Sequence, residues 1–237
     1  MGKKKNPQLS TFIEGELINL CIPSRDFAKF SKWHSWFNDN RITKYIEQGV
    51  YPNSPKKQLD YFDNLEKERI TLIITEKNNS AFGVISLSFI NLSRKSCDIS
   101  LIVSNDGNAR LRPYMSLEAM ALMTEHAFNK VGMHRVNAGQ HIKLSGWQTR
   151  LELIGYQLEG LHENKFVKGI EVANTMSIAI IRKNYELIIK NRNGKLWDSF
   201  VEMKSRVKLI PKVPFVDKLT KFYETERLNY YKKIFLL

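Results

Sequence analysis

The chain has 237 residues, of which 43% are hydrophobic, 11% aromatic and 26% charged, a composition that can build a well-packed core. It excludes fibrous and wholly disordered proteins, and the length predicts one domain with an appendage, or two small domains. The net charge of +13 indicates a surface that attracts phosphate, whether on nucleic acid, an anionic cofactor, a nucleotide-linked substrate or a lipid headgroup. Residues 183–237 carry +7 of this charge, so the tail is the more basic part per residue.

Two cysteines, Cys21 and Cys97, lie far apart and without the spacing of a zinc site or a disulfide framework. We expect ordinary buried thiols and no metal. The basic start Met1–Asn6 is followed by Pro7 and polar residues, which is not the pattern of a signal peptide. Because no apolar run reaches the roughly 18 residues that span a bilayer, we expect no membrane span and a cytoplasmic location.

In chain order, Glu16–Ile22 is typical of a strand, and the segment Arg25–Ile46 is predicted to be helical. Its aromatic residues recur at spacings of three and four, which places their rings on one helix face, where core packing is their simplest role. Ser54 is expected to cap a helix that extends to about Lys67.

Three strands with short polar connections then predict an antiparallel meander: Ile70–Glu76, Phe82–Leu92 and Ser96–Val103. The polar loop Ser104–Arg112 leads to Pro113, which suits the start of a helix over Tyr114–Val131. The remaining elements expected are a strand at Met133–Ala138, a short helix at Lys143–Ile154, and strands at Tyr156–Phe166 and Glu171–Arg182.

This order predicts a mixed α/β (α+β) domain over residues 16–182, preceded by a basic segment at 1–15 and followed by a basic helical extension at 183–237. In the extension, an amphipathic helix is expected around residues 196–203 and another over Val216–Phe235. Such an extension is expected to pack on its own domain or to form a homodimer. Contact of its basic residues with RNA, a ribosome or a membrane surface is the less favoured alternative.

Several segments of the domain resemble the GCN5-related N-acetyltransferases (GNATs), in particular the branch that acetylates ribosomal-protein N-termini, antibiotics and nucleotide-linked amino sugars. The resemblance covers about 165 residues. It depends on Glu16–Leu20, Trp36–Asp39, Ile42–Tyr45, Phe82–Leu87, Ser116–Ala119, His126–Phe128, His134–Val136 and, most specifically, Leu153–Gly160.

The resemblance implies a mostly antiparallel sheet that splays between its fourth and fifth predicted strands, with acetyl-CoA as co-substrate. The pantetheine arm would pair with strand backbone near Ile102 and Val103. The pyrophosphate would lie at the following loop and helix start, where amides and the helix dipole favour an anion. The residues implied there are Arg110, Arg112, Tyr114, Met115 and Ser116.

The chain departs from the family pattern at two places. Arg112 and Tyr114 stand where the family has loop glycines, and Arg110 with Arg112 could compensate by charge-assisted contact with phosphate. Leu144, Trp147 and Leu151 stand where the family has an Asn, a Ser and the tyrosine acid for the leaving thiolate. A catalytically silent relative, which uses the fold for binding, therefore stays open.

Candidates for the general base are Asp98, on the fourth predicted strand, and His141, whose imidazole titrates near neutral pH. His34, Tyr51 and Asn53 are candidates for acceptor binding, because the first two helices shape that site in the family. Three of these candidates have a structural alternative: a strand-edge carboxylate for Asp98, a solvated loop histidine for His141 and a packed helix histidine for His34.

The function expected is transfer of acetyl from acetyl-CoA to a primary amine of a nucleotide-linked amino sugar or another small amine. An amine attacks a thioester only when it is neutral, so the site must accept a proton and stabilise the developing oxyanion. The alternatives are acetylation of a protein N-terminus, with the basic tail docked on a ribosome, and the silent binding module.

Overall fold

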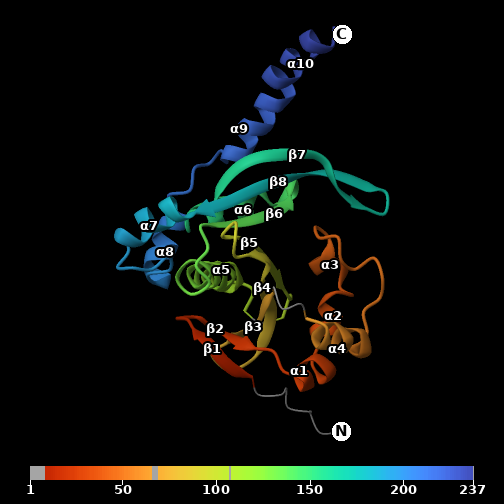
Figure 1. Cartoon of the computed structure of the whole chain (residues 1–237), viewed down its shortest axis with the longest axis vertical. Coiled ribbons are helices and arrows are strands. Elements are labelled where there is room, and N and C mark those ends of the chain that lie inside the picture. Colours follow the sequence, from red (N-terminus) through yellow and green to blue (C-terminus); the bar gives the residue numbers. More distant parts are fainter. Residues whose placement is uncertain (1–8, 66–68, 107, 237) are drawn as a thin grey trace.

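An eight-stranded sheet organises the protein, with strand order β1-β2-β3-β4-β5-β6-β8-β7 (Figure 1). The computed structural model describes residues 9–65, 69–106 and 108–236. The strands are β1 Ser10–Glu14, β2 Ile18–Ile22, β3 Ile70–Glu76, β4 Ala81–Asn91, β5 Ser96–Val103, β6 Arg135–His141, β7 Gln157–Lys168 and β8 Glu171–Ile181. The helices are α1 Arg25–Phe30, α2 Trp33–Trp36, α3 Asn40–Thr43, α4 Pro55–Asp63, α5 Arg112–Asn129, η1 Ile142–Leu144, α6 Ser145–Glu152, α7 Arg182–Lys190, α8 Phe200–Val207, α9 Phe215–Phe222, the π-helical turn η2 Tyr223–Arg227 and α10 Leu228–Phe235.

The strand pairing confirms the predicted fold class. Neighbouring strands are antiparallel except for β5 and β6, which are parallel. A parallel pair needs a crossover connection, and here the long helix α5 supplies it. β5 and β6 are the fourth and fifth strands of the prediction, because β1 precedes the strand expected first.

Each face of the sheet has its own apolar cluster. Helix α5 covers one face, and its Leu117, Met120 and Met123 pack with residues of β2–β6. On the other face, the short helices α1 and α2 bury Phe27, Trp33 and Trp36 against β2, β3 and β4. The two cysteines are free thiols: Cys97 lies in the cluster of α5 and Cys21 in the other cluster. Their expected burial is confirmed.

Three predictions for the N-terminal part of the chain were wrong. The segment Arg25–Ile46 forms three short helices, because Ser31 ends α1 and the Asp39 side chain caps α3 by accepting from the Arg41 amide. Phe30 consequently leaves the apolar face and is exposed. The helix capped by Ser54 ends at Asp63, whereas Lys67 lies outside the described residues. Strand β1, within the segment expected to be only a basic arm, pairs with β2.

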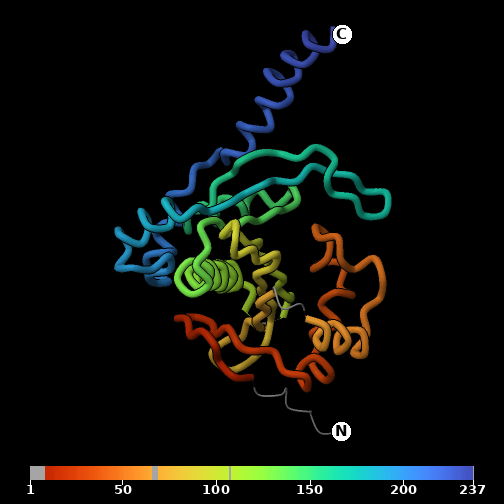
Figure 2. The backbone as a smooth tube through the Cα atoms, in the orientation of Figure 1, coloured from red at the N-terminus to blue at the C-terminus, as the bar shows by residue number. Residues whose placement is uncertain are grey.

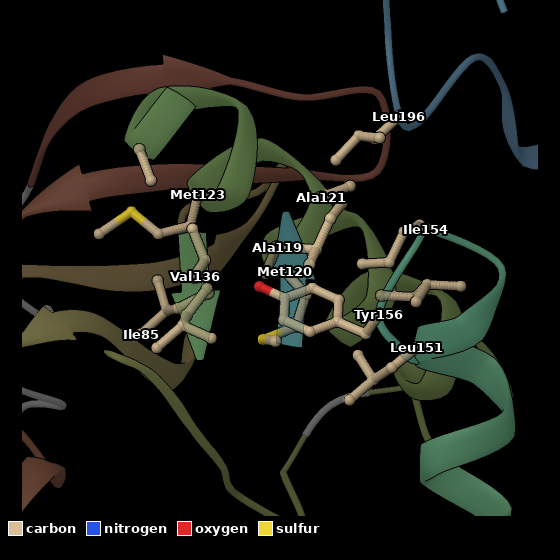
Figure 3. Close-up of a cluster of buried hydrophobic side chains, with 14 of the residues drawn as sticks. Ile85, Ala119, Met120, Ala121, Met123, Val136, Leu151, Ile154, Tyr156 and Leu196 are labelled. Atoms are coloured by element: carbon tan, nitrogen blue, oxygen red, sulfur yellow. The ribbon is translucent and has the colours of Figure 1, made fainter. Parts of the chain in front are cut away.

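The Gly155-Tyr156 pair closes the core at the start of β7. Gly155 has a φ of +96°, and a Cβ there would lie 2.6 Å from the Ile188 side chain, so a larger residue does not fit. Tyr156 is fully buried, and its hydroxyl bonds the Thr124 hydroxyl at 2.8 Å. Figure 3 shows Tyr156 beside Leu151 and Ile154, in a cluster that also includes Leu196 of the C-terminal extension.

Residues 183–208 pack against the same core as the preceding domain. Leu196, Trp197 and Met203 are at most 4% exposed and belong to the cluster of α5. The Trp197 indole and the Phe200 amide both donate to a carboxylate oxygen of Glu16, at 2.9 and 2.7 Å. This is the packing on its own domain that was expected for the extension, while the boundary at 182/183 stays a prediction.

The chain ends in a long helix, α9–η2–α10, that leads away from the sheet (Figure 2). Its first part touches β7, where Arg227 pairs with Glu163. Beyond that contact, Tyr230, Ile234 and Phe235 are exposed. Within the described residues, no helix has the length and apolarity needed to cross a bilayer.

Glu118 of α5 holds the β1–β2 turn from inside the protein. Its side chain is fully buried and accepts hydrogen bonds from the backbone amides of Glu16 and Leu17. Burial raises the pKa of Glu118 from 4.5 to about 7, although the two amides favour the ionised form. The folded protein therefore binds this proton more tightly than the unfolded chain.

We therefore predict that part of the stability is lost as the pH rises from about 4.5 through about 7. In wild type this contribution is on the order of 3 kcal/mol, whereas Glu118→Gln lacks it because an amide does not titrate. Urea unfolding at pH 5.0 and pH 7.5 should show the free energy of unfolding of wild type falling relative to that of Glu118→Gln. The exposed Glu186→Gln serves as control, and a wild-type-to-variant difference that stays constant with pH contradicts the prediction.

Candidate active site

The parallel strands β5 and β6 pair at only three positions and then separate. The paired residues are Ser96 with Arg135, Cys97 with Val136 and Asp98 with Asn137. Beyond them, residues 99–103 keep their pairing with β4, and residues 138–141 keep theirs with β8. The backbone edges that face each other across the gap have no strand partner, so their polar groups are available to a ligand.

A cavity of about 780 Å³ occupies this opening and continues towards the helices of the other face. Strand residues of its wall come from both sides of the gap: Val84, Ser86, Ile99, Ser100, Leu101, Ile102, Ala138, Gly139 and Gln140. A volume of this size suits a small substrate together with the end of an extended cofactor arm. Another hollow, of about 620 Å³, lies between α6, α7 and Phe215, away from the strand opening.

One wall of the cavity is apolar. Met120 of α5 and Leu144, Trp147 and Leu151 from η1 and α6 line it. These side chains pack against the core cluster of α5 and stand where β5 and β6 part. They exclude water from this side of the cavity, and polar interactions are stronger there than in solvent.

The opposite wall is aromatic and polar, and comes from α2–α4 and their connections. Its aromatic residues are Trp33, Phe37, Tyr45, Tyr51 and Tyr61, and its ionisable residues besides the tyrosines are Glu47, Lys57 and Arg69. Gly49 allows the tight turn in this wall: its φ is +86°, and a Cβ would lie 2.7 Å from the Thr43 hydroxyl.

Lys168, at the end of β7, fastens this wall to the far side of the sheet. Its ammonium donates to the carbonyls of Thr43 at 2.7 Å, Ile46 at 3.3 Å and Gln48 at 2.8 Å. Figure 1 shows the β7–β8 hairpin reaching towards α3. Beside this contact, the Tyr45 ring lies tilted against the His141 ring, with centroids 4.8 Å apart. The wall that contains residues 43–50 is thus held from both halves of the sheet.

A comparison with models of known protein families identifies the family of this chain. The family described as "Acetyltransferase (GNAT) domain" matches residues 22–184. The chain belongs to this GNAT family. A search of curated protein sequences finds no significant match.

Solved structures share the GNAT fold with this chain at low sequence identity. Spermidine N-acetyltransferase from Vibrio cholerae, in complex with CoA and spermine, is 15% identical with a TM-score of 0.62, covering 72% of this chain and 98% of that one. A candidate acetyltransferase from T. thermophilus is 14% identical with a TM-score of 0.60, covering 84% and 96%. Both likenesses concern the fold alone.

The GNAT family acts on acetyl-CoA, and the opening between β5 and β6 fits this co-substrate. The unpaired edge of β5 offers amides and carbonyls to the pantetheine arm, and the start of α5 lies at the end of the same loop. Acetyl-CoA would supply an activated acyl group, whereas this chain's residues would orient it and exclude water.

Of the residues predicted to bind substrates, Tyr51, Asn53 and Ile102 line the cavity. Asn53 is fixed there because its amide and carbonyl bond the Asn38 side chain at 2.7 and 2.8 Å. Val103 ends β5 at the open side of the gap. The roles of these residues stay predictions, although the fold gathers them around one opening.

The two predicted bases lie beside the cavity and not in its lining. Asp98 is at the closed end of the gap and accepts from Asn137 at 3.0 Å. His141 is 1% exposed, and its Nδ1 accepts from the Lys143 amide at 3.1 Å. Burial lowers the pKa of His141, with Nε2 3.6 Å from a Glu171 carboxylate oxygen, so the ring presents a proton donor in that direction.

His34 lies at a separate depression. Its Nδ1 is 3.2 Å from the Ser31 carbonyl oxygen, and it lines a hollow with Arg41 and Asp106. This hollow faces the loop after β5, whereas Tyr51 and Asn53 face the main cavity. The structure therefore does not bring His34 together with the other acceptor-site candidates.

The residues predicted for the phosphate site cluster at the start of α5. Met115 and Ser116 are buried, whereas Arg110 is exposed. The Arg112 guanidinium donates to the carbonyls of Asn105 and Asp106, at 2.7 and 2.9 Å. Tyr114 packs edge-on against Phe200, with ring centroids 5.1 Å apart.

Sequence reasoning did not single out Glu47, Lys57, Arg69 or Gln140, which line the cavity. Glu47 could have been found, because it follows the Ile42–Tyr45 segment of the resemblance. Lys57 and Arg69 offer no such signal, because their place depends on how α4 and the start of β3 pack. Among the described residues, no group of three His, Cys, Asp or Glu side chains is placed to hold a metal.

We predict that Lys168→Met loosens the wall formed by residues 43–50. Losing three hydrogen bonds from a charged donor should raise amide hydrogen exchange in that loop by roughly tenfold or more. Exchange in β5 should not change, because its pairing with β4 is intact. The exposed Lys165→Met on the same strand is the control, and equal exchange in both variants refutes the assignment.

Proposed function

We propose that this GNAT enzyme transfers acetyl from acetyl-CoA to the primary amine of an anionic small molecule, such as a nucleotide-linked amino sugar. The observation that carries the proposal is the charge of the aromatic and polar wall from α2–α4, which we call the acceptor wall because the amine would bind there. Lys57 and Arg69 line it, and Glu47 is the one Asp or Glu in the cavity wall among the described residues. The pair gives this wall a positive potential that attracts phosphate.

The contacts of the two cations leave their charges available. Lys57 donates to the Pro52 carbonyl at 3.0 Å, and Arg69 donates to the Tyr61 hydroxyl at 3.3 Å. Both partners are neutral, and among the described residues neither cation has a salt bridge to a carboxylate. A diphosphate can therefore bind both cations without displacing an acid.

The same charges disfavour a polyamine. The Vibrio cholerae relative is a spermidine N-acetyltransferase, and spermidine carries several positive charges at neutral pH. Lys57 and Arg69 would repel such a substrate, whereas the aromatic rings of Tyr51 and Tyr61 suit the faces of a sugar or nucleobase. An anionic acceptor with a ring thus fits this wall better than a flexible polycation.

The chemistry requires a neutral amine beside the thioester. In the proposal, the Glu47 carboxylate or a water held by Ser100 and Gln140 accepts the ammonium proton. The nitrogen lone pair then attacks the acetyl carbonyl carbon, and the C–N bond forms. The C–S bond breaks, and the leaving thiolate takes up the second proton that the nitrogen loses. Unpaired amides of β5 stabilise the oxygen as it gains charge.

We predict that Lys57→Gln and Arg69→Gln each raise KM for a UDP-linked amino sugar by roughly tenfold, because each removes one charge-assisted contact. KM for acetyl-CoA should stay unchanged. Thiol release measured with the UDP-linked sugar and with spermidine tests this, with Lys56→Gln, on the same helix but outside the cavity lining, as control. Faster turnover of spermidine, with no effect of either substitution, contradicts the proposal.

A second candidate is acetylation of a protein N-terminus, and the projecting helix α9–α10 is the observation that favours it. Phe222, Tyr230, Ile234 and Phe235 are at least half exposed, and Lys232 and Lys233 lie among them. The helix could dock on a ribosome or form a homodimer with a second chain. Both uses require the part beyond the Arg227–Glu163 pair.

We predict that truncation after Arg227 leaves acetylation of small amines unchanged, because no described residue of α9, η2 or α10 lines the cavity. If the second candidate holds, the same truncation abolishes acetylation of ribosomal proteins on intact ribosomes. Activity on ribosomes that survives truncation removes that candidate. A failure of wild type to turn over any amine supports the silent binding module.

A further inference from the structure

The amides at the start of α5, where a GNAT would hold the cofactor pyrophosphate, already have partners. Arg110 and Leu111 donate their backbone N–H groups to the Asn108 side-chain oxygen, at 3.1 and 3.3 Å. The Arg112 amide donates to the Asn108 carbonyl at 3.0 Å. Asn108 therefore occupies amides that glycine-containing loops leave to phosphate, and another group must neutralise the anion.

The Arg112 side chain is also hydrogen-bonded within its own loop. Its guanidinium donates to the Asn105 and Asp106 carbonyls, which closes the loop on itself. Using Arg112 for phosphate would require breaking these contacts. Arg110 has an exposed side chain and can contribute only a solvated charge, which is weak.

Arg150 of α6 is placed to supply the missing contact. Its Nη1 is buried and has no hydrogen-bond partner within residues 9–65, 69–106 and 108–236. The guanidinium lies over the ring of Tyr114, in the first turn of α5, with 5.7 Å between its carbon and the ring centroid. Residues three apart share a helix face, so Arg150 adjoins Trp147, which lines the cavity.

The chemistry of this group favours a phosphate. A buried guanidinium N–H without an acceptor is costly, and a phosphate oxygen satisfies it with a charge-assisted bond. Arginine presents its donors as a planar fork that matches two oxygens of one phosphate. The cation–π contact with Tyr114 restricts the guanidinium, so less rotational freedom remains to be lost on binding.

The C-terminal extension fixes this arrangement. Phe200, the first residue of α8, packs edge-on against Tyr114 with 5.1 Å between ring centroids. The Phe200 amide is anchored on Glu16 at 2.7 Å. Residues beyond the family match at 22–184 thus hold the ring that supports Arg150.

We propose that Arg150, supported by Tyr114 and Phe200, binds the phosphates of CoA in place of the loop amides that Asn108 occupies. The assignment rests on the use of acetyl-CoA in the proposed function and adds the residue that recognises its phosphates. Arg150 is a binding residue, and Phe200 is a positioning residue that acts through Tyr114.

Calorimetric titration at physiological salt tests the assignment with three ligands: CoA, dephospho-CoA, which lacks the 3′-phosphate, and pantetheine, which lacks all phosphates. Arg150→Gln should weaken CoA binding by roughly 10- to 100-fold, as expected for a charge-assisted contact. Its affinity for pantetheine should equal that of wild type. Phe200→Leu should weaken CoA binding about threefold by the loss of one aromatic contact.

The ligands also locate the contact. If Arg150→Gln weakens the binding of dephospho-CoA as much as that of CoA, Arg150 binds the pyrophosphate. If the substitution leaves dephospho-CoA binding unchanged, Arg150 binds the 3′-phosphate. Either outcome supports the assignment. Arg94→Gln, which removes one positive charge from an exposed loop, should bind CoA like wild type.

Equal CoA affinity in wild type and Arg150→Gln would overturn the assignment and leave acetyl-CoA use intact. No CoA binding by wild type would overturn both. If circular dichroism shows a lower melting temperature for Arg150→Gln than for wild type, Arg150→Lys tests the assignment instead. Lysine keeps the positive charge but lacks the planar set of donors, so its affinity for CoA should lie between those of wild type and Arg150→Gln. A lysine variant with the affinity of wild type would refute the need for a fork.

Discussion

The structure depends on one feature of backbone pairing: β5 and β6 are hydrogen-bonded at three positions and then part. Continuing the ladder would satisfy the polar groups of residues 99–103 and 138–141, but a cavity with Met120, Leu144, Trp147 and Leu151 in its wall lies at this opening. The sheet therefore keeps an interior edge, which an ordinary protein avoids. Every other part of the candidate site is arranged around that edge. An apolar wall lies on one side, a charged and aromatic wall on the other, and the start of α5 at the end of the β5 loop.

Contacts distant in sequence keep the opening in shape. Lys168 ties the acceptor wall to the β7–β8 hairpin, and Glu118 ties the β1–β2 turn to α5. Glu16 in turn holds Trp197 and Phe200, which reach the first turn of α5 through Tyr114. Removing Glu118 or Lys168 has a large cost, because the Glu118 carboxylate is buried and the Lys168 ammonium makes three hydrogen bonds. The extension after residue 182 therefore helps to hold the first turn of α5 in place.

Much of the fold could be predicted from the sequence, and the reasons differ by element. Strands β3 and β5 were predicted residue for residue, because turn-forming residues bracket them. The break of Arg25–Ile46 into three helices was missed, since the aromatic spacing continues across the caps at Ser31 and Asp39. Strand β1 was missed because its polar sequence becomes a strand only by pairing with β2. Among the predicted site residues, Ile102, Tyr51 and Asn53 do line the cavity. Lys168 and Arg150 depend on partners far along the chain, and local pattern carries no signal of them.

The most direct test of the central claim is a crystal structure of the protein with CoA bound. The account predicts the pantetheine arm between the edges of β5 and β6, bonded to backbone of residues 99–103, with the sulfur facing the wall that holds Lys57 and Arg69. CoA bound elsewhere, for example in the hollow between α6, α7 and Phe215, with the strand edges still unpaired, would contradict it.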